Sequence, residues 1–142
     1  MLYKFLFPAK PDDTKSSLLL LVARIVFGLL LMSHGIQKWS NFGQLSEVFP
    51  DPIGLGSHVS LILAIFAELF CSVAFIFGFL YRLAMIPMLF TMCVAFFVVH
   101  ANDPFGVKEL AFVYLAVFVI MDIAGPGKFA IDRYFVRQRA NR

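Results

Sequence analysis

The sequence predicts an all-α integral membrane protein, a bundle of four transmembrane helices with both termini in the cytoplasm. The first observation is composition: 61% of the 142 residues are hydrophobic and 15% are charged, whereas soluble domains are about half apolar and about a quarter charged. The second is a mean hydropathy of +0.85. The third is that the apolar residues form four long blocks, each close to the roughly 20 residues that a membrane-spanning helix needs.

Four spans are expected, at residues 17–38, 58–80, 83–100 and 108–124. Only the short connection FLYRL separates the second span from the third, so these two should form an antiparallel hairpin. Pro87 lies one turn inside the third span, where it either kinks the helix or occupies an early turn.

Two segments flank the membrane domain of residues 17–124. Residues 1–16 form a short cytoplasmic N-terminal segment without the features of a cleaved signal peptide. Residues 125–142 begin with GPG, which should end the fourth span. They continue as a basic, aromatic cytoplasmic tail of the kind that lies on an anionic membrane leaflet.

The first loop, residues 39–57, leaves two interpretations open. Its apolar residues recur at roughly helical spacing as far as Phe49, and Pro50 and Pro52 then break the pattern. One interpretation is a short amphipathic helix at the outer interface, anchored by Trp39. The other is a plain connecting loop.

The distribution of basic residues predicts the orientation. Four spans put both termini on one side, and most Lys and Arg residues share that side: Lys4, Lys10, Lys15, Arg82, Lys128, Arg133, Arg137, Arg139 and Arg142. Lys38 and Lys108 flank the other side. Because cytoplasmic loops carry the excess of Lys and Arg, the termini should be cytoplasmic.

Glu68 lies inside the second span, within AIFAELFCSVAF. The 14 Leu, Ile, Val and Phe residues between positions 59 and 80, at about −0.3 to −0.6 kcal/mol each, outweigh one mid-span charge of about +3 kcal/mol. Insertion is therefore allowed, but the carboxylate should face the bundle interior, be paired with a cation from span one or span four, or be protonated. Cys71, Ser72 and Phe75 share its helical face, and intramembrane carboxylates usually mark a site or pathway.

Six ionisable residues should converge in one layer beneath the outer surface. At about 1.5 Å per residue, Glu68 lies roughly 20 Å above the cytoplasmic turn. The other five lie at the outer ends of spans one, three and four, and the full set is His34, Lys38, Glu68, His100, Lys108 and Glu109. We expect this layer to form a binding site.

A second, inner polar layer is expected at the cytoplasmic end. Arg24 lies about 10 Å above the inner interface and Asp122 lies near the inner end of the fourth span, so the two could form a structural ion pair. Arg24, Gly28, Gly35 and Lys38 fall within about 80° of one another on span one, and the glycines would allow close helix approach.

Several of these residues also have simpler explanations. Lys38, Lys108 and His100 lie at span ends, where snorkelling to the interface accounts for a basic residue. Cys71 and Cys93 are more typical of small core residues than of a redox pair, although they lie at matching depths in the hairpin. No metal site and no nucleic-acid interface is predicted.

With its residues arranged in this way, the chain resembles the DoxX family from about Leu18 to Asp132. The resemblance rests on the order and spacing of RIVFG, HGIQK, the Glu68 span ending in GFLYR, KELAFVY, and GPGKFAID. Where Ser-Leu-Asp is expected after GPG, this chain has Ala130, Ile131 and Asp132, and larger residues follow Glu68 than the family leads us to expect.

The resemblance implies a multi-pass protein of a bacterial inner membrane. It also implies relatives such as the large membrane subunit of a thiosulfate:quinone oxidoreductase and membrane partners in thiol-redox complexes. The chain would then be a redox-linked subunit of a quinone-linked oxidoreductase that works with a redox partner subunit, and a homodimer is a further option.

In that hypothesis the outer layer binds a quinone or a small sulfur oxyanion. Lys38, Lys108, His34 and His100 would contact the ligand, and Glu68 or Glu109 would transfer protons. No flavin or nucleotide motif and no CxxC is present, so electrons must come from a bound cofactor or a partner.

Three alternatives remain open from the sequence. A non-catalytic scaffold or anchor for a partner complex would need its ion pairs only for folding. Haem binding through His34 and His100 would require both imidazoles to face each other across the bundle. A small-solute transporter with four short spans would have to assemble as a dimer.

Overall fold

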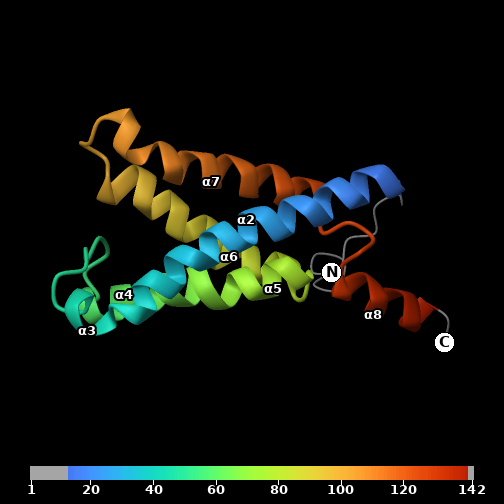
Figure 1. Cartoon of the computed structure of the whole chain (residues 1–142), viewed down its shortest axis with the longest axis horizontal. Coiled ribbons are helices and arrows are strands. Elements are labelled where there is room, and N and C mark those ends of the chain that lie inside the picture. The colour runs from blue at the N-terminus through green and yellow to red at the C-terminus, as the bar shows by residue number, and fades with distance from the viewer. Residues whose placement is uncertain (1–12, 141–142) are drawn as a thin grey trace.

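The computed structural model describes residues 13–140, and all of its regular elements in that range are helices (Figure 1). Only the last few residues of the predicted N-terminal segment, 1–16, lie within the described part. The elements are α2 (Thr14–Ser40), α3 (Phe42–Leu45), α4 (Ser57–Ile65), η1 (Phe66–Phe70), α5 (Cys71–Phe77), α6 (Tyr81–Val94), η2 (Ala95–Val99), α7 (Phe105–Ala124) and α8 (Ile131–Ala140). The two η elements are π-helical turns.

Three of the described helices are long and apolar enough to cross a membrane. They are α2, the continuous helix Ser57–Phe77 made of α4, η1 and α5, and the helix Tyr81–Val99 made of α6 and η2. α7 has 20 residues but carries three charged ones, Lys108, Glu109 and Asp122. Three candidate spans are therefore established, and a fourth span through α7 remains a proposal.

The helices pack in chain order as an antiparallel bundle (Figure 1). α2 lies against α5 and η1, and α6 lies between α5 and α7. The buried centre is apolar and is built from Leu31, Cys71, Phe75, Tyr81, Ala84, Met85, Met88, Met92, Tyr114, Phe118 and Met121. The outward faces of the same helices are also apolar, including Leu19, Ile120 and Ile123, as expected of helices surrounded by lipid.

Two glycines let α2 approach its neighbour closely, which confirms the predicted stripe on span one. A Cβ atom at Gly28 would lie 2.3 Å from Cγ1 of Ile76. At Gly35 it would lie 2.7 Å from the backbone nitrogen of Leu69. Backbone cannot move aside as a side chain can, so Gly35 fixes the distance between α2 and η1.

The two ends of the bundle are built differently. At the end where α7 finishes, here called the α8 end, α7 stops at Ala124 before Gly125 and Gly127, which have φ of +84° and +74°. This confirms the predicted stop at GPG. At the opposite end, here called the loop end, the chain between α2 and α4 contains the one-turn helix α3, followed by residues 46–56 without helix. The helical alternative is thus correct for one turn.

The α5–α6 hairpin is fastened by a residue from α8. Gly78 and Leu80 both adopt left-handed backbone conformations, with φ of +65° and +45°. The buried Asp132 carboxylate accepts hydrogen bonds from the backbone N–H groups of Leu80 at 2.9 Å and Tyr81 at 2.8 Å. Asp132 therefore caps α6 from about fifty positions away in the chain.

The predicted ion pair between Arg24 and Asp122 is wrong. Asp122 pairs with Arg82, with Nη1 and Oδ2 3.6 Å apart, because the start of α6 lies beside the end of α7. Arg24 is fully buried, and its Nη2 donates to the backbone oxygen of Phe129 at 2.9 Å. Arg24 also lies close enough to Asp132 to stabilise that carboxylate electrostatically.

Candidate ligand pocket at the loop end of the bundle

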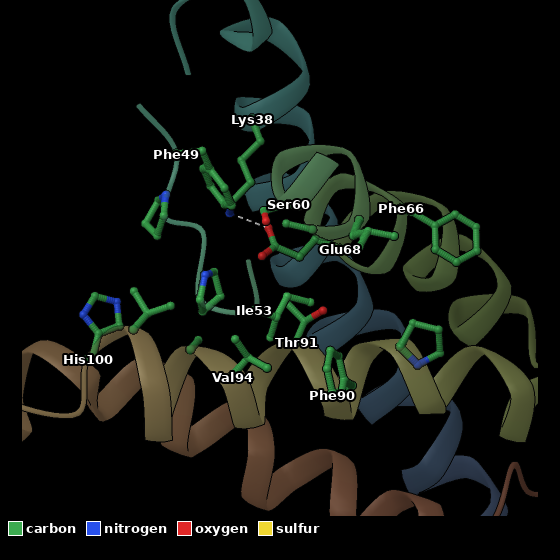
Figure 2. A pocket seen from close by; sticks show the side chains of 17 residues that line it. Lys38, Phe49, Ile53, Ser60, Phe66, Glu68, Phe90, Thr91, Val94 and His100 are labelled. Carbon is green, nitrogen blue, oxygen red and sulfur yellow. Dashed lines mark hydrogen bonds and ion pairs between the residues drawn. The ribbon is translucent and has the colours of Figure 1, made fainter. Parts of the chain in front are cut away.

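A pocket of about 470 Å³ lies at the loop end, between α4–η1 and α6–η2 (Figure 2). This volume falls within the range of sites that enclose one small organic molecule. Most of the wall is apolar, and its polar residues are Lys38, Ser60, Glu68, Thr91 and His100. The lining residues are Lys38, Phe49, Pro50, Pro52, Ile53, Ser60, Leu63, Ala64, Phe66, Glu68, Pro87, Phe90, Thr91, Val94, Ala95, Val99 and His100.

The pocket exists because two neighbouring helices separate as they approach the loop end. α6 packs closely against α5 and η1, whereas its contact with α4 is slight. Pro87 lies inside α6 at the pocket wall, where its missing N–H removes one bond from the helical ladder. The hairpin is therefore closed at the α8 end and open at the loop end.

Lys38 and Glu68 form the polar centre of this pocket (Figure 2). Nζ of Lys38 donates to Oε2 of Glu68 at 2.5 Å, and the side chains are 23% and 7% exposed. Glu68 comes from the middle of the second span and Lys38 from the last turn of α2. The pairing of the intramembrane acid with a cation, expected from the sequence, is present.

Both π-helical turns border the pocket. η1 contributes Phe66 and Glu68, and η2 contributes Ala95 and Val99. A π turn inserts an extra residue into an α-helix and is found disproportionately at functional sites. Neither π turn has a signal in the sequence, since helical periodicity does not distinguish an inserted residue in a uniformly apolar segment.

Residues 49–53 cover the loop end of the pocket and are held by Asp51. Its carboxylate accepts hydrogen bonds from the N–H groups of Leu55 and Gly56, each at 2.9 Å, and from the Ser60 hydroxyl at 3.0 Å. The backbone N–H of Gly56 is the largest cause of a pKa of Asp51 below its ordinary value. From the sequence, the prolines predicted only a break in the helical pattern, and nothing in it indicated that this stretch lines a pocket.

His100 is the third predicted site residue that reaches the pocket. Its Nδ1 lies 2.7 Å from Oδ2 of Asp103, which places a carboxylate against the ring.

The remaining members of the predicted outer layer do not line the pocket. His34 packs edge-on against Tyr114, with ring centroids 6.1 Å apart. Lys108 donates to the backbone oxygen of Ala101 at 3.0 Å, and Glu109 is exposed at the start of α7. Depth alone placed these residues in one layer, but α7 is separated from the pocket by α6.

The cysteines and histidines suggest no cofactor attachment in the described part of the chain. Cys71 is buried, Cys93 is partly buried, and both are free thiols. Residues 13–140 contain no cluster of three or more His, Cys, Asp or Glu side chains that could hold a metal ion. His34 and His100 have different neighbours, which gives no support to a shared haem.

Comparison with known families identifies the group to which this bundle belongs. The family model named DoxX matches residues 19–101, more than half of the chain, from α2 to the end of η2. The chain belongs to the DoxX family. The matched part contains every wall of the pocket, whereas α7 and α8 lie beyond it.

This DoxX protein also has a relative in Haemophilus influenzae. The two are 26% identical over 131 residues, which cover 87% of each chain, and the relative is described as an uncharacterized protein. No solved structure matches the chain. Family membership together with the apolar helices makes this a multi-pass membrane protein.

Proposed function

We propose that this DoxX protein binds a quinone in the pocket at the loop end and acts as a membrane subunit of a redox complex. The observation that carries the proposal is an apolar pocket, of a volume that suits one ring, with the partly buried Lys38–Glu68 pair in its wall. A planar ring with carbonyl oxygens fits a pocket whose walls are mostly apolar and carry a charged hydrogen-bond donor, here the ammonium of Lys38.

The charges in the pocket favour a neutral ligand over a sulfur oxyanion. The charge of Lys38 is balanced by Glu68 at 2.5 Å, and His100 faces Asp103. A doubly charged anion would lose its hydration without meeting an uncompensated cation. A quinone carbonyl needs only a hydrogen-bond donor, which the Lys38 ammonium can supply while remaining paired.

The chain can supply protons to such a ligand but not electrons. Reduction of a quinone to a quinol consumes two electrons and two protons. Lys38 lies at hydrogen-bonding distance from Glu68, so a proton given up by the ammonium to a quinone oxygen could be replaced through the carboxylate. The electrons would come from a redox partner subunit, and we propose a bacterial inner membrane as the location.

A scaffold role is the second candidate, and the α8 end favours it. There Arg24 and Asp132 are buried and join three segments of the chain. These contacts stabilise the fold at the α8 end, and they could hold α8 in position to bind a partner chain without any ligand. In that case the Lys38–Glu68 pair would matter only for folding.

The test compares quinone binding by wild type, Glu68→Gln and the control Glu109→Gln. Glu109 is exposed and outside the pocket, so its substitution removes an acid from the same chain without touching the site. Each protein is purified in mild detergent, and binding of a short-tailed ubiquinone and of thiosulfate is measured by native mass spectrometry and thermal shift.

We expect wild type and Glu109→Gln to bind the quinone equally, and folded Glu68→Gln to bind it about tenfold more weakly. Equal binding by all three proteins would show that the pair is not part of the site. If all three fold and none binds quinone or thiosulfate, the scaffold role is supported instead.

A further inference from the structure

The pocket is lined toward the loop end by residues 49–53 and is bordered by exposed aromatic rings at its side. At the loop end, residues 49–53 lie over the cavity and are tied to the start of α4 through Asp51. Three hydrogen bonds to one carboxylate hold this segment in place, so this part of the pocket wall is fixed.

The side wall has a different character. Phe66 from η1 and Phe90 from α6 both line the pocket, yet they are 49% and 56% exposed. A side chain that borders the cavity and is also half exposed lies on its rim. Leu63, another lining residue, is 45% exposed beside them.

This rim faces lipid, because it belongs to two helices of membrane-spanning length. Phe66 lies in the middle of the helix Ser57–Phe77, and Phe90 lies in the middle of Tyr81–Val99. The surface around the rim is apolar on both helices, with Phe70 and Ile86 more than half exposed. Water has no favourable route through such a surface, whereas an apolar chain has.

We propose that the pocket opens sideways into the bilayer between Phe66 and Phe90, and that its ligand is a membrane-dissolved amphiphile. The uncharged, hydrogen-bond-accepting head lies against the Lys38–Glu68 pair. The apolar tail leaves between the two rings and remains in lipid. This inference rests on the proposed ligand site and adds the route of entry and the requirement for a tail.

The size of the pocket agrees with this division of the ligand. A volume of about 470 Å³ encloses a substituted ring. It does not enclose in addition a chain of several isoprene units, so the tail of a natural quinone has to leave the cavity. The two phenylalanines provide flat, apolar surfaces against which such a tail packs.

The experiment maps where each end of the ligand lies in the full-length protein in lipid nanodiscs. Two photoreactive ubiquinone analogues are used, one with a diazirine on the ring and one with a diazirine on the second isoprene unit of the tail. After irradiation, the labelled peptides are identified by mass spectrometry.

We expect the ring probe to label residues near Lys38, Ser60 and His100, and the tail probe to label residues 62–66 and 86–90. Tail labelling of residues 49–56 instead would show that the ligand leaves through the cover at the loop end. That result would overturn the lateral route but leave the quinone site standing. Absence of labelling by both probes would overturn the site and the route together.

A second measurement uses variants of the rim. In wild type, a tailed quinone should bind about tenfold more tightly than its tailless head group after correction for partition into lipid. Phe66→Ala combined with Phe90→Ala should weaken binding of the tailed quinone more than binding of the head group, and so should reduce this advantage. The control Phe97→Ala, which removes an exposed ring outside the pocket lining, should retain it. Equal affinities for tailed and tailless ligands in wild type would contradict the proposal.

Discussion

Glu68 is 7% exposed within a membrane-spanning helix, and Lys38 is the cation that pairs with it. Lys38→Met would leave this carboxylate unpaired, and we expect a loss of about 3 kcal/mol in stability. The double variant Lys38→Met with Glu68→Met should recover most of the loss, because apolar residues replace a buried pair at little cost. Thermal unfolding in detergent measures both effects.

The matched control for the comparison of the single and double variants is Lys108→Met. Lys108 donates to a backbone oxygen at the surface and has no part in the pocket. It should change stability by less than about 0.5 kcal/mol. If Lys38→Met were as mild as this control, the pair would contribute nothing to the fold.

Gly35 sets the approach of α2 to the π turn that carries Glu68. Gly35→Ala would place a Cβ atom 2.7 Å from the backbone nitrogen of Leu69, so the helices must separate at a cost of about 1–3 kcal/mol. The same shift moves Lys38 away from Glu68 and should weaken quinone binding. Gly106→Ala meets nothing within 4 Å and should be neutral or slightly stabilising. Equal melting temperatures for both variants would contradict this reasoning.

Asp51 makes the pocket cover sensitive to acid. Hydrogen bonds from Gly56 and its neighbours lower the pKa of Asp51 below the ordinary value of 3.8. The stability that these hydrogen bonds give to the folded loop is therefore fully present above pH 3.8 and is lost as the pH falls through the lowered pKa. Hydrogen exchange of the backbone amides of Leu55 and Gly56, corrected for intrinsic rates, should be slow at about pH 6 and fast at a pH below the lowered pKa of Asp51. Asp51→Asn should show fast exchange at both. Slow exchange in Asp51→Asn would show that the carboxylate does not hold the loop.

At the scale of residues, the sequence was informative wherever one side chain conflicted with its surroundings. A glutamate among apolar residues required a cation, and Lys38 was among the few available. The partner of Arg24 was not predictable, because a helical wheel gives a direction and a depth but not which neighbouring helix lies there. The hydrogen bond from Arg24 to the backbone of Phe129 has no sequence signature at all.

At the scale of elements, the cap that Asp132 provides for α6 is the contact most open to test. Asp132→Ala would leave the buried N–H groups of Leu80 and Tyr81 without an acceptor, at a cost of about 2–3 kcal/mol. Asp132→Asn keeps one acceptor oxygen and should lose about half as much. Thermal unfolding of the two variants measures the difference, and equal losses would show that the charge, not the cap, is what matters.

The pH dependence of this cap has the opposite sign to that of Asp51. Burial raises the pKa of Asp132 above 3.8, although the N–H group of Tyr81 and the charge of Arg24 act against it. The folded protein then binds more protons than the unfolded chain between the two pKa values. The contribution of Asp132 to the stability of the fold therefore falls as the pH rises through that window. The Asp132→Asn variant should lack this pH dependence.

Most elements could be predicted from the length of each apolar segment and from the glycines and prolines that end it. The four predicted spans are all helical in the structure, and their ends differ from the predicted ones by only a few residues. The turn at Gly78, the stop at GPG and the glycine stripe on α2 followed from ordinary rules. The two π turns and the pocket between α4 and α6 did not. A cavity arises where two helices diverge, and divergence depends on packing that no single segment encodes.

At the scale of the whole molecule, the orientation in the membrane is the remaining prediction. If α7 spans the bilayer and both termini are cytoplasmic, alkaline phosphatase fused after Arg142 should be inactive. The same enzyme inserted at Asn102, between η2 and α7, should be active. Activity at both positions would mean that α7 lies on the outer side, and activity only after Arg142 would invert the whole topology.

The cap supplied by Asp132 also has a consequence for the order in which the protein is made. A ribosome delivers the chain from its N-terminus, so Leu80 and Tyr81 enter the membrane long before Asp132 exists. The α5–α6 turn stays unlocked during that interval, and the first three helices can still adjust against one another. Synthesis of Asp132 is therefore the step that lets the α5–α6 turn close, after the helices on both sides of it have been made.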